Sequence, residues 1–325
     1  SKQIAHRGSV RPMDDNQNTP LPLSIPGWLL GYLGTALIRR GLNPGLSLAA
    51  RRRWLQQLSR WTTRRPAGLR IETATVGTVP CEWLHPASAA GQDDSSVIVY
   101  LHGGGYTLGS LDTHRGLAAH LAQRSRCRVL TVDYRLAPEH PFPAALEDAV
   151  AVVQALLEGG LSHHRLVLAG DSAGGGLALA CALAMRDLDL PRVQALCLLS
   201  PWADLGLEGD SVEALAGRER ILSAQWLREC ASAYAGDQLQ ASLASPLHAE
   251  LDRLPPCLIQ VGSEEILLDD ARRLAAGIEA AGGQCALQIA PDLWHVWPLF
   301  AGWMPGRARP CRRSAISFRP AGADR

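Results

Sequence analysis

The sequence has almost no lysine, no closely spaced cysteine pair and no glycine-lysine step of a phosphate-binding loop. Lys2 is the only lysine among 32 cationic residues, and the eight cysteines never occur as CxxC. Disulfide frameworks and zinc sites need clustered cysteine or histidine residues, so the spacing argues against both. We expect reduced thiols that pack as small apolar side chains, no metal, and a cytoplasmic protein. The cysteines stand at positions 81, 127, 181, 197, 230, 257, 285 and 311.

Long apolar runs are also missing. The longest such run near the N-terminus extends over 14 residues, from Ile25 to Ile38, and ends at Arg39 and Arg40. A helix needs about 20 apolar residues to span a bilayer, so we expect no stable membrane insertion. A helix that lies along a membrane surface or caps an apolar site remains compatible with this run.

Charge is nearly balanced overall and uneven along the chain. The net charge is +1, but residues 1–65 hold eleven Lys or Arg and two Asp or Glu, while residues 305–325 hold six and one. These arginines alternate with Trp and Leu at helical spacing, which is typical of a solvated helix face. We therefore expect no nucleic-acid partner.

Hydrophobic residues make up 47% of the 325 residues, enough for a large core. Short apolar runs alternate with helical windows after residue 70, which predicts an α/β fold with a mostly parallel eight-stranded sheet flanked by helices. The first two strands lack a helix between them and should form an antiparallel hairpin. The expected strands are 71–76, 79–84, 97–101, 127–132, 165–170, 193–200, 257–261 and 285–290, and helical windows include 143–158, 173–188, 223–235 and 268–281.

Three regions are expected. Residues 1–65 would form a leader and two cap helices, at 27–40 and 46–61. In the second helix Trp54, Leu58 and Trp61 share one face, with Arg51, Arg52 and Arg53 turned away. Residues 66–304 would form the core, with a cap insertion at about 203–250. Residues 305–325 would form an irregular tail because Pro305, Pro310 and Pro320 interrupt any helix. A homodimer through the exposed last strand is a further expectation.

The stretch from Gly170 to Gly174 follows a predicted strand, opens a predicted helix and reads GDSAG. It matches G-x-S-x-G, in which a strained turn exposes a nucleophilic serine, here Ser172. Small residues at the two glycine positions let neighbouring backbones approach. An ordinary glycine-rich turn explains the motif equally well, so its surroundings must decide.

A second glycine-rich segment, His102 to Tyr106, reads HGGGY directly after the strand 97–101. Its backbone amides could bind the oxyanion of a tetrahedral intermediate, together with the amide of Ala173. The competing interpretation is a dinucleotide site, with glycines at 103, 105 and 109 and Asp133 as the ribose-binding acid. Against it, the glycine spacing departs from the fingerprint, and His102 and the GDSAG turn have no role in it.

A serine nucleophile needs an acid and then a histidine later in the chain. His295 follows the last predicted strand, and Glu265 follows the strand 257–261. Glu265 would orient the imidazole of His295 and stabilise its protonated form. Glu264, Asp269 and Asp270 remain alternatives for the acid.

These motifs together resemble the α/β-hydrolase superfamily and, within it, the bacterial hormone-sensitive lipase-like carboxylesterases. The resemblance covers roughly residues 70–304 and rests on HGGGY, GDSAGG (170–175), YRLAPE (134–139) and the two loops that carry Glu265 and His295. It implies a cofactor-free enzyme with the triad Ser172, Glu265 and His295, and oxyanion donors at Gly103, Gly104 and Ala173. The sequence departs from this family in its Glu265-Ile step, where Asp-Pro is usual, and in its tail, where an amphipathic helix is usual.

The expected activity is hydrolysis of small-molecule esters with short to medium acyl chains, because the glycine-rich entrance is tight and the lid short. Tyr106, Trp202 and Val296 are candidate pocket walls. A lactone hydrolase or an N- or O-deacetylase would use the same triad, and a non-catalytic ligand-binding protein on this fold is a remote alternative.

Overall fold

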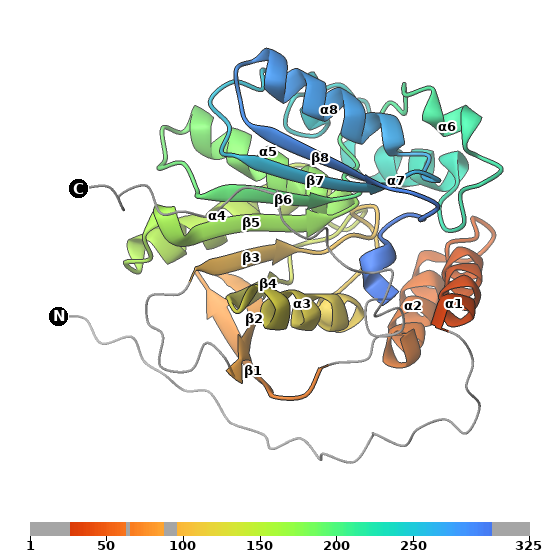
Figure 1. Ribbon diagram of the computed structural model, residues 1–325, viewed down its shortest axis with the longest axis horizontal. Helices are drawn as coiled ribbons and strands as arrows, with labels where there is room; N and C mark the ends of the chain where they lie inside the picture. Colours follow the sequence, from red (N-terminus) through yellow and green to blue (C-terminus); the bar gives the residue numbers. More distant parts are fainter. Residues whose placement is uncertain (1–26, 63–65, 88–95, 301–325) are drawn as a thin grey trace.

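An eight-stranded sheet runs through the molecule, with helices packed against it (Figure 1). The computed structural model describes residues 27–62, 66–87 and 96–300. The strands are β1 Leu69–Val76, β2 Val79–Pro86, β3 Val97–Leu101, β4 Arg128–Val132, β5 Leu166–Asp171, β6 Ala195–Leu199, β7 Cys257–Gly262 and β8 Cys285–Ala290.

The strand order is β1-β2-β4-β3-β5-β6-β7-β8. β2 pairs antiparallel with both β1 and β4, and all other pairs are parallel. The predicted mostly parallel sheet and its N-terminal hairpin are therefore confirmed. The sheet ends at β8, whose Ile289 is 40% exposed.

The central strands are apolar on both sides because helices cover both faces of the sheet. Every residue of β3 and β5 is buried. Val99 and Leu168, paired in register, belong to one core cluster, whereas Tyr100 and Ala169, the next pair, belong to a second cluster. The helices are α3 Leu111–Ser125, α4 Ala144–Glu158, α5 Ala173–Asp187, α6 Ser211–Ala214, α7 Ala224–Ala235 and α8 Leu268–Ala280, with 3-10 turns at His163–Arg165, Pro246–His248 and Trp297–Phe300.

The helix α3 was not among the helical windows of the sequence. Alanine, glycine and polar residues interrupt its apolar face, so hydrophobic periodicity is weak over residues 111–125. Its start is well marked, because the hydroxyl of Ser110 accepts from the amide of Thr113 while the Thr113 hydroxyl accepts from the amide of Ser110. This reciprocal capping was the available signal.

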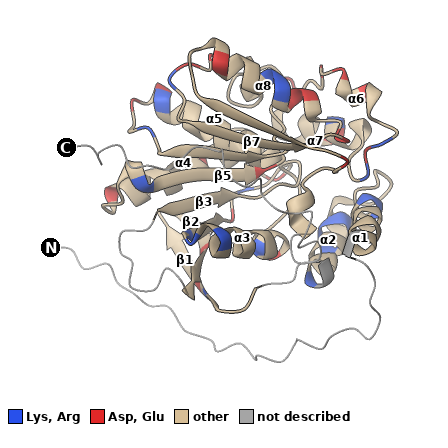
Figure 2. Ribbon diagram, viewed as in Figure 1, with Lys and Arg blue, Asp and Glu red and all other residues tan. Residues whose placement is uncertain are grey.

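Two cap helices, α1 Gly27–Gly41 and α2 Leu48–Thr62, lie side by side at one end of the sheet (Figure 1). They carry arginine and no acidic residue, as Figure 2 shows. The predicted leader, before residue 27, and the predicted tail, residues 305–325, lie outside the described residues. In the parts that are described, no helix is long and apolar enough to cross a membrane.

The cap arginines differ from the sequence expectation. Arg51 is 9% exposed and pairs with Glu229 of α7 at 3.2 Å. Arg52 is half-buried and holds Glu139 in a two-pronged pair at 2.7 and 2.8 Å, so only Arg53 is turned to solvent. The prediction that all three point away was wrong, because acidic partners from distant segments compensate the buried guanidinium groups.

Candidate active site

Ser172 stands at the turn between β5 and α5. Its backbone has φ 53° and ψ −123°, in the left-handed region where a serine is strained. A Cβ at position 170 would clash with the carbonyl of Gly174, and a Cβ at position 174 would clash with the carbonyl of Leu101. Glycine at both positions therefore allows the sharp turn that the sequence predicts, with Ser172 at its apex.

Glu265 and His295 form a hydrogen-bonded pair. Glu265 lies in the loop after β7 and His295 in the loop after β8, and the two side chains are 0% and 5% exposed. The imidazole Nδ1 and the carboxylate Oε2 are 2.8 Å apart. Because an ionised carboxylate only accepts hydrogen bonds, Nδ1 carries the proton and donates it to Glu265. This leaves Nε2 of the neutral ring as an acceptor.

The other three candidate acids, one in this loop and two in the first turn of α8, have different partners. Glu264 lies 3.5 Å from Arg218, Asp269 bonds to Ser211, and Asp270 accepts the amides of Ala203 and Asp204. Of the four candidates that the sequence left open, Glu265 is the one bonded to His295.

Ser200 holds Glu265 from the other side, and sequence reasoning missed it. Its hydroxyl donates to Oε1 of Glu265 at 2.7 Å and accepts from the amide of Val296 at 3.1 Å. The same Oε1 accepts from the amide of Gly262 at 2.5 Å. Both oxygens of Glu265 are therefore bonded, which fixes the carboxylate toward His295. No local motif could reveal Ser200, which stands 65 residues before Glu265.

Three carboxylates act on the imidazole of His295. Burial alone would lower its pKa, but the hydrogen bond from His295 to Glu265 and the negative charges of Glu265, Glu219 and Asp171 outweigh burial and raise the pKa. An opposite charge nearby favours the protonated ring. The ring is therefore poised to take up a proton.

Asp171, the residue before Ser172, organises the glycine-rich loop. It is buried, and its Oδ1 accepts from the Tyr100 hydroxyl at 2.5 Å and from the Gly103 amide at 3.0 Å. Its Oδ2 lies 3.3 Å from Nε2 of His114. Burial would raise the pKa of Asp171, but these partners, His114 foremost, lower it overall. The loop of residues 102–109 is thus anchored to the nucleophile turn by one carboxylate.

This contact bears on which backbone amides could bind an oxyanion. The N–H of Gly103 already donates to Asp171 at 3.0 Å, which argues against the expected role of this amide as an oxyanion donor. Within residues 96–300, the amides of Gly104, Gly105 and Ala173 donate to no protein acceptor. Gly104, with φ 123°, also lines the pocket beside Ser172.

A cavity of about 100 Å³ joins these groups under the cap. Ser172 and His295 both line it, and the predicted wall residue Val296 does too. Tyr106 and Trp202 do not line it; both are fully buried in the core, where Tyr106 stacks on Tyr234. The cap contributes Ile38 from α1, Leu42 just after it, Leu55 and Leu58 from α2, and Ile221 and Leu222 from the insertion.

The glycine-rich segment does not fit a dinucleotide site. Such a site needs a helix that opens directly at the glycines, so that its N-terminus faces a pyrophosphate. Here the segment instead turns back on itself, with the Leu108 amide donating to the Gly104 carbonyl at 2.9 Å. The helix α3 begins only at Leu111, and the Asp171 side chain lies against Gly103.

The chain is similar to known α/β hydrolases in sequence and in structure. Residues 98–299 match the family model described as the α/β-hydrolase fold. The match takes in the glycine loop, the Ser172 turn, Glu265 and His295. The chain belongs to the α/β-hydrolase family.

Curated relatives of this α/β hydrolase are named as acetyl-hydrolase and esterase. An acetyl-hydrolase of Streptomyces hygroscopicus is 45% identical over 72% of this chain and 77% of the relative. An esterase of Acinetobacter venetianus is 36% identical over 83% of this chain and 88% of the relative.

A solved esterase of the bacterial hormone-sensitive lipase family aligns with a TM-score of 0.80 at 40% identity, over 85% of this chain and 92% of that one. An esterase/lipase from an uncultured bacterium aligns with a TM-score of 0.78 at 36% identity, over 87% and 94%. This α/β hydrolase is therefore an enzyme of the hormone-sensitive lipase-like esterase group.

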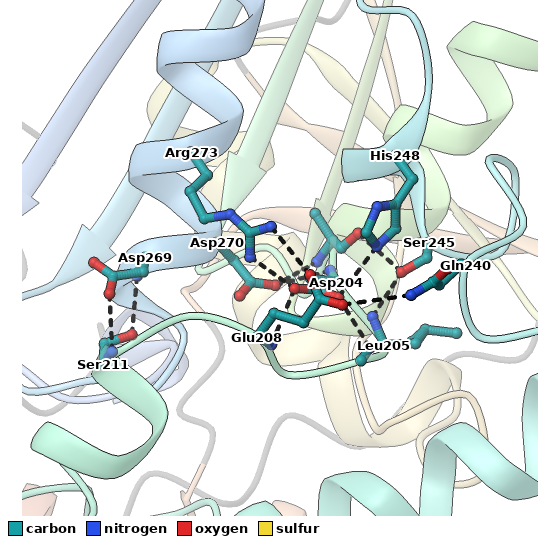
Figure 3. Close-up of polar contacts among 12 residues, drawn as sticks. Asp204, Leu205, Glu208, Ser211, Gln240, Ser245, His248, Asp269, Asp270 and Arg273 are labelled. Atoms are coloured by element: carbon teal, nitrogen blue, oxygen red, sulfur yellow. Dashed lines mark hydrogen bonds and ion pairs between the residues drawn. The ribbon is translucent and has the colours of Figure 1, made fainter.

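A cluster of polar side chains near α8 of the α/β hydrolase has the composition of a cation site. One ligand atom each from Asp204, Glu208 and His248 lies within 4.8 Å of the others. Figure 3 shows that Arg273 already reaches Asp204, at 2.7 Å, and it lies 3.7 Å from Glu208. The guanidinium supplies the positive charge, so we interpret the cluster as an ion-pair network that ties the segment after β6 to α8.

Proposed function

We propose that this chain is a serine carboxylesterase that hydrolyses short-chain carboxylic esters, with Ser172 as nucleophile, His295 as general base and Glu265 as the acid that orients it. The observation that carries the proposal is the 2.8 Å bond from His295 to Glu265 at the pocket that also exposes Ser172. Glu265 keeps the proton on Nδ1, so Nε2 is free to accept the serine proton.

In the first half of the reaction Ser172 Oγ attacks the ester carbonyl carbon while its proton passes to Nε2 of His295. The carbonyl oxygen becomes an oxyanion, which the amides of Gly104, Gly105 and Ala173 would hold. The tetrahedral intermediate then collapses, the carbon–alkoxy bond breaks, and His295 returns the proton to the leaving alcohol. The product of this half is an acyl-Ser172 ester.

In the second half a water molecule attacks the acyl carbon and gives its proton to His295. Collapse of the second intermediate breaks the bond to Ser172, whose oxygen takes the proton back, and the carboxylic acid leaves. Every proton is carried by His295, so the cycle needs no cofactor.

Short acyl chains are proposed because of the cavity. Its volume of about 100 Å³ is below the roughly 300–1,000 Å³ of pockets for drug-sized ligands, and its walls are mostly apolar. An acetyl or butyryl group fits this space without displacing α1 or α2. We expect a long chain to extend beyond this cavity.

A second candidate is the hydrolysis of acetyl groups attached through oxygen or nitrogen. It is supported by the small cavity and by the 45% identical relative named as an acetyl-hydrolase. The triad would act in the same way, with an amine or alcohol as leaving group. Parallel assays on an O-acetyl and an N-acetyl compound with the same leaving skeleton distinguish the two.

The test is hydrolysis of p-nitrophenyl acetate, butyrate, octanoate and palmitate by the wild type and by Ser172→Ala. We expect activity on the acetate and butyrate that falls steeply with octanoate and is lost in the variant. Activity that survives Ser172→Ala would refute the proposed nucleophile. Ser263→Ala, a serine in the loop after β7 with no contact to His295, is the matched control.

A further inference from the structure

One carboxylate of the cap insertion is buried without an ion-pair partner. Glu219 lies in the loop between α6 and α7 and is 4% exposed. A buried carboxylate is costly unless hydrogen bonds compensate its charge. The described residues place no Lys or Arg side chain within ion-pair distance of its carboxylate. Backbone amides must therefore compensate the charge of the carboxylate.

The carboxylate accepts three backbone N–H groups from two different segments. Its Oε1 accepts from Ile221 at 2.8 Å and from Leu222 at 3.2 Å, and its Oε2 accepts from Ile266 at 3.2 Å. Ile221 and Leu222 line the cavity, whereas Ile266 directly follows Glu265. A single side chain therefore connects the cap wall of the pocket to the backbone beside Glu265.

The cap helix α1 is tied to the same point. Nη1 of Arg39 donates to the backbone carbonyl of Glu219 at 2.7 Å and to that of Leu222 at 3.3 Å. These bonds hold the loop against α1, next to Ile38 and Leu42 of the pocket. Arg39 therefore connects α1 to the loop that carries Glu219.

The negative charge of Glu219 also acts on the imidazole. The groups that act on His295 are Glu265 from the loop after β7, Asp171 from the end of β5 and Glu219 from the insertion. The Arg39 guanidinium bonds to the backbone carbonyl of Glu219 at 2.7 Å. Burial raises the pKa of Glu219 and the charge of Glu265 adds to this, while His295 opposes it.

We propose that Glu219 is a positioning residue for the Glu265–His295 pair, which it serves by holding the segment after Glu265 in place. This inference rests on the proposed function for its kinetic consequences. A merely structural turn cap would explain the bonds to Ile221 and Leu222. It would not explain the bond across to Ile266, nor would it predict any effect on the titration of His295.

The test compares Glu219→Gln with Glu219→Asp. Glutamine keeps an acceptor for Ile221 and Leu222 but removes the charge and presents an NH2 group to the amide of Ile266. We expect kcat to fall by about 10- to 100-fold, as for a small misplacement of a catalytic group. The acid limb of kcat/KM should move to lower pH by roughly 0.5–1 unit, less than the effect of a directly bonded charge. Aspartate keeps the charge, but its shorter side chain cannot reach all three amides. We therefore expect kcat to fall while the acid limb of the kcat/KM pH profile stays unchanged.

Glu229→Gln is the matched control, because it removes a cap ion pair with Arg51 and has no contact with His295. Its acid limb should equal that of the wild type. An NMR titration of the His295 ring measures the effect of the Glu219 charge on the imidazole without turnover. It therefore tests the inference even if the chain proves inactive on esters. The inference would be overturned if folded Glu219→Gln had the same kcat, the same acid limb of the kcat/KM pH profile and the same His295 ring titration as the wild type. If Glu219→Gln does not fold, a wild-type kcat in Glu219→Asp would overturn it.

Discussion

The Ser200 hydroxyl donates a 2.7 Å hydrogen bond to Glu265 and at the same time accepts the amide of Val296, the residue after His295. One small side chain at the end of β6 thus connects the two loops that carry the acid and the base. Parallel strands end at the same edge of the sheet, so β6, β7 and β8 deliver these three loops to one place.

Replacing Ser200 by alanine should impair catalysis and stability together. The variant loses a donor to Glu265 and leaves the buried amide of Val296 without a partner, which costs about 1–3 kcal/mol. We expect kcat for p-nitrophenyl acetate to fall by about tenfold and the free energy of unfolding to fall by that amount. Ser200→Thr, which retains the hydroxyl, should recover part of kcat. Unchanged kcat in a folded Ser200→Ala would show that Glu265 does not depend on this bond.

Replacing Asp171 by alanine should displace the glycine-rich loop. The buried amide of Gly103 and the hydroxyl of Tyr100 both lose their acceptor. The loop presents the proposed oxyanion donors, and removing one such donor lowers kcat by roughly 10²- to 10³-fold. We expect the fall in kcat of Asp171→Ala to approach this size. Tyr100→Phe removes a single bond to Asp171 and should lose far less. Equal kcat values for Asp171→Ala and wild type would contradict this role of Asp171.

The two-pronged contact between Arg52 and Glu139 predicts a pH dependence of cap docking. The hydrogen bond from Arg52 lowers the pKa of Glu139 from 4.5 to about 2. A carboxyl whose folded pKa is lowered stabilises the fold above its unfolded pKa, and that contribution is lost as pH falls from about 4.5 to about 2. Both side chains are partly exposed, so we expect less than about 1 kcal/mol. The Tm difference between wild type and Glu139→Gln should shrink over this pH range; a constant difference would refute the assignment.

Enlarging the cavity should shift the chain-length preference. Leu58 of α2 lines the pocket, and Leu58→Ala would open space for longer acyl chains. Each additional buried methylene is worth about 0.8 kcal/mol, or about fourfold in kcat/KM. The octanoate-to-acetate ratio of kcat/KM should therefore rise severalfold. Leu188→Ala, at a leucine that is 59% exposed and outside the pocket, should leave the ratio unchanged. A ratio equal to wild type in Leu58→Ala would place the acyl chain elsewhere.

The sequence predicted those parts of the site that depend on local backbone geometry and strand order. GDSAG places Ser172 because only glycine tolerates the close approaches at positions 170 and 174. Glu265 and His295 were predicted because each follows a strand that ends at the same edge of the sheet. The positions of the central strands could also be predicted, because strands buried on both faces are uniformly apolar.

Contacts between distant segments could not be predicted. The Gly103 amide donates to the carboxylate of Asp171, 68 residues away in the sequence. The partly buried Arg52 side chain pairs with Glu139, 87 residues away. Helical periodicity assigns arginine to solvent unless a buried acid is known to face it. Glu219 and Ser200 carry no motif at all, and only the fold brings them beside Glu265.

The most direct test of the central claim is to map the adduct of a serine-reactive phosphonate in the wild type, Ser172→Ala, His295→Ala and Glu265→Gln. Mass spectrometry of the intact protein and its peptides should find one adduct on Ser172 in the wild type, formed in step with the loss of p-nitrophenyl acetate hydrolysis. Labelling should be absent in Ser172→Ala, far slower in His295→Ala and intermediate in Glu265→Gln. An adduct on another residue, or equal labelling rates in wild type and His295→Ala, would contradict the proposed triad.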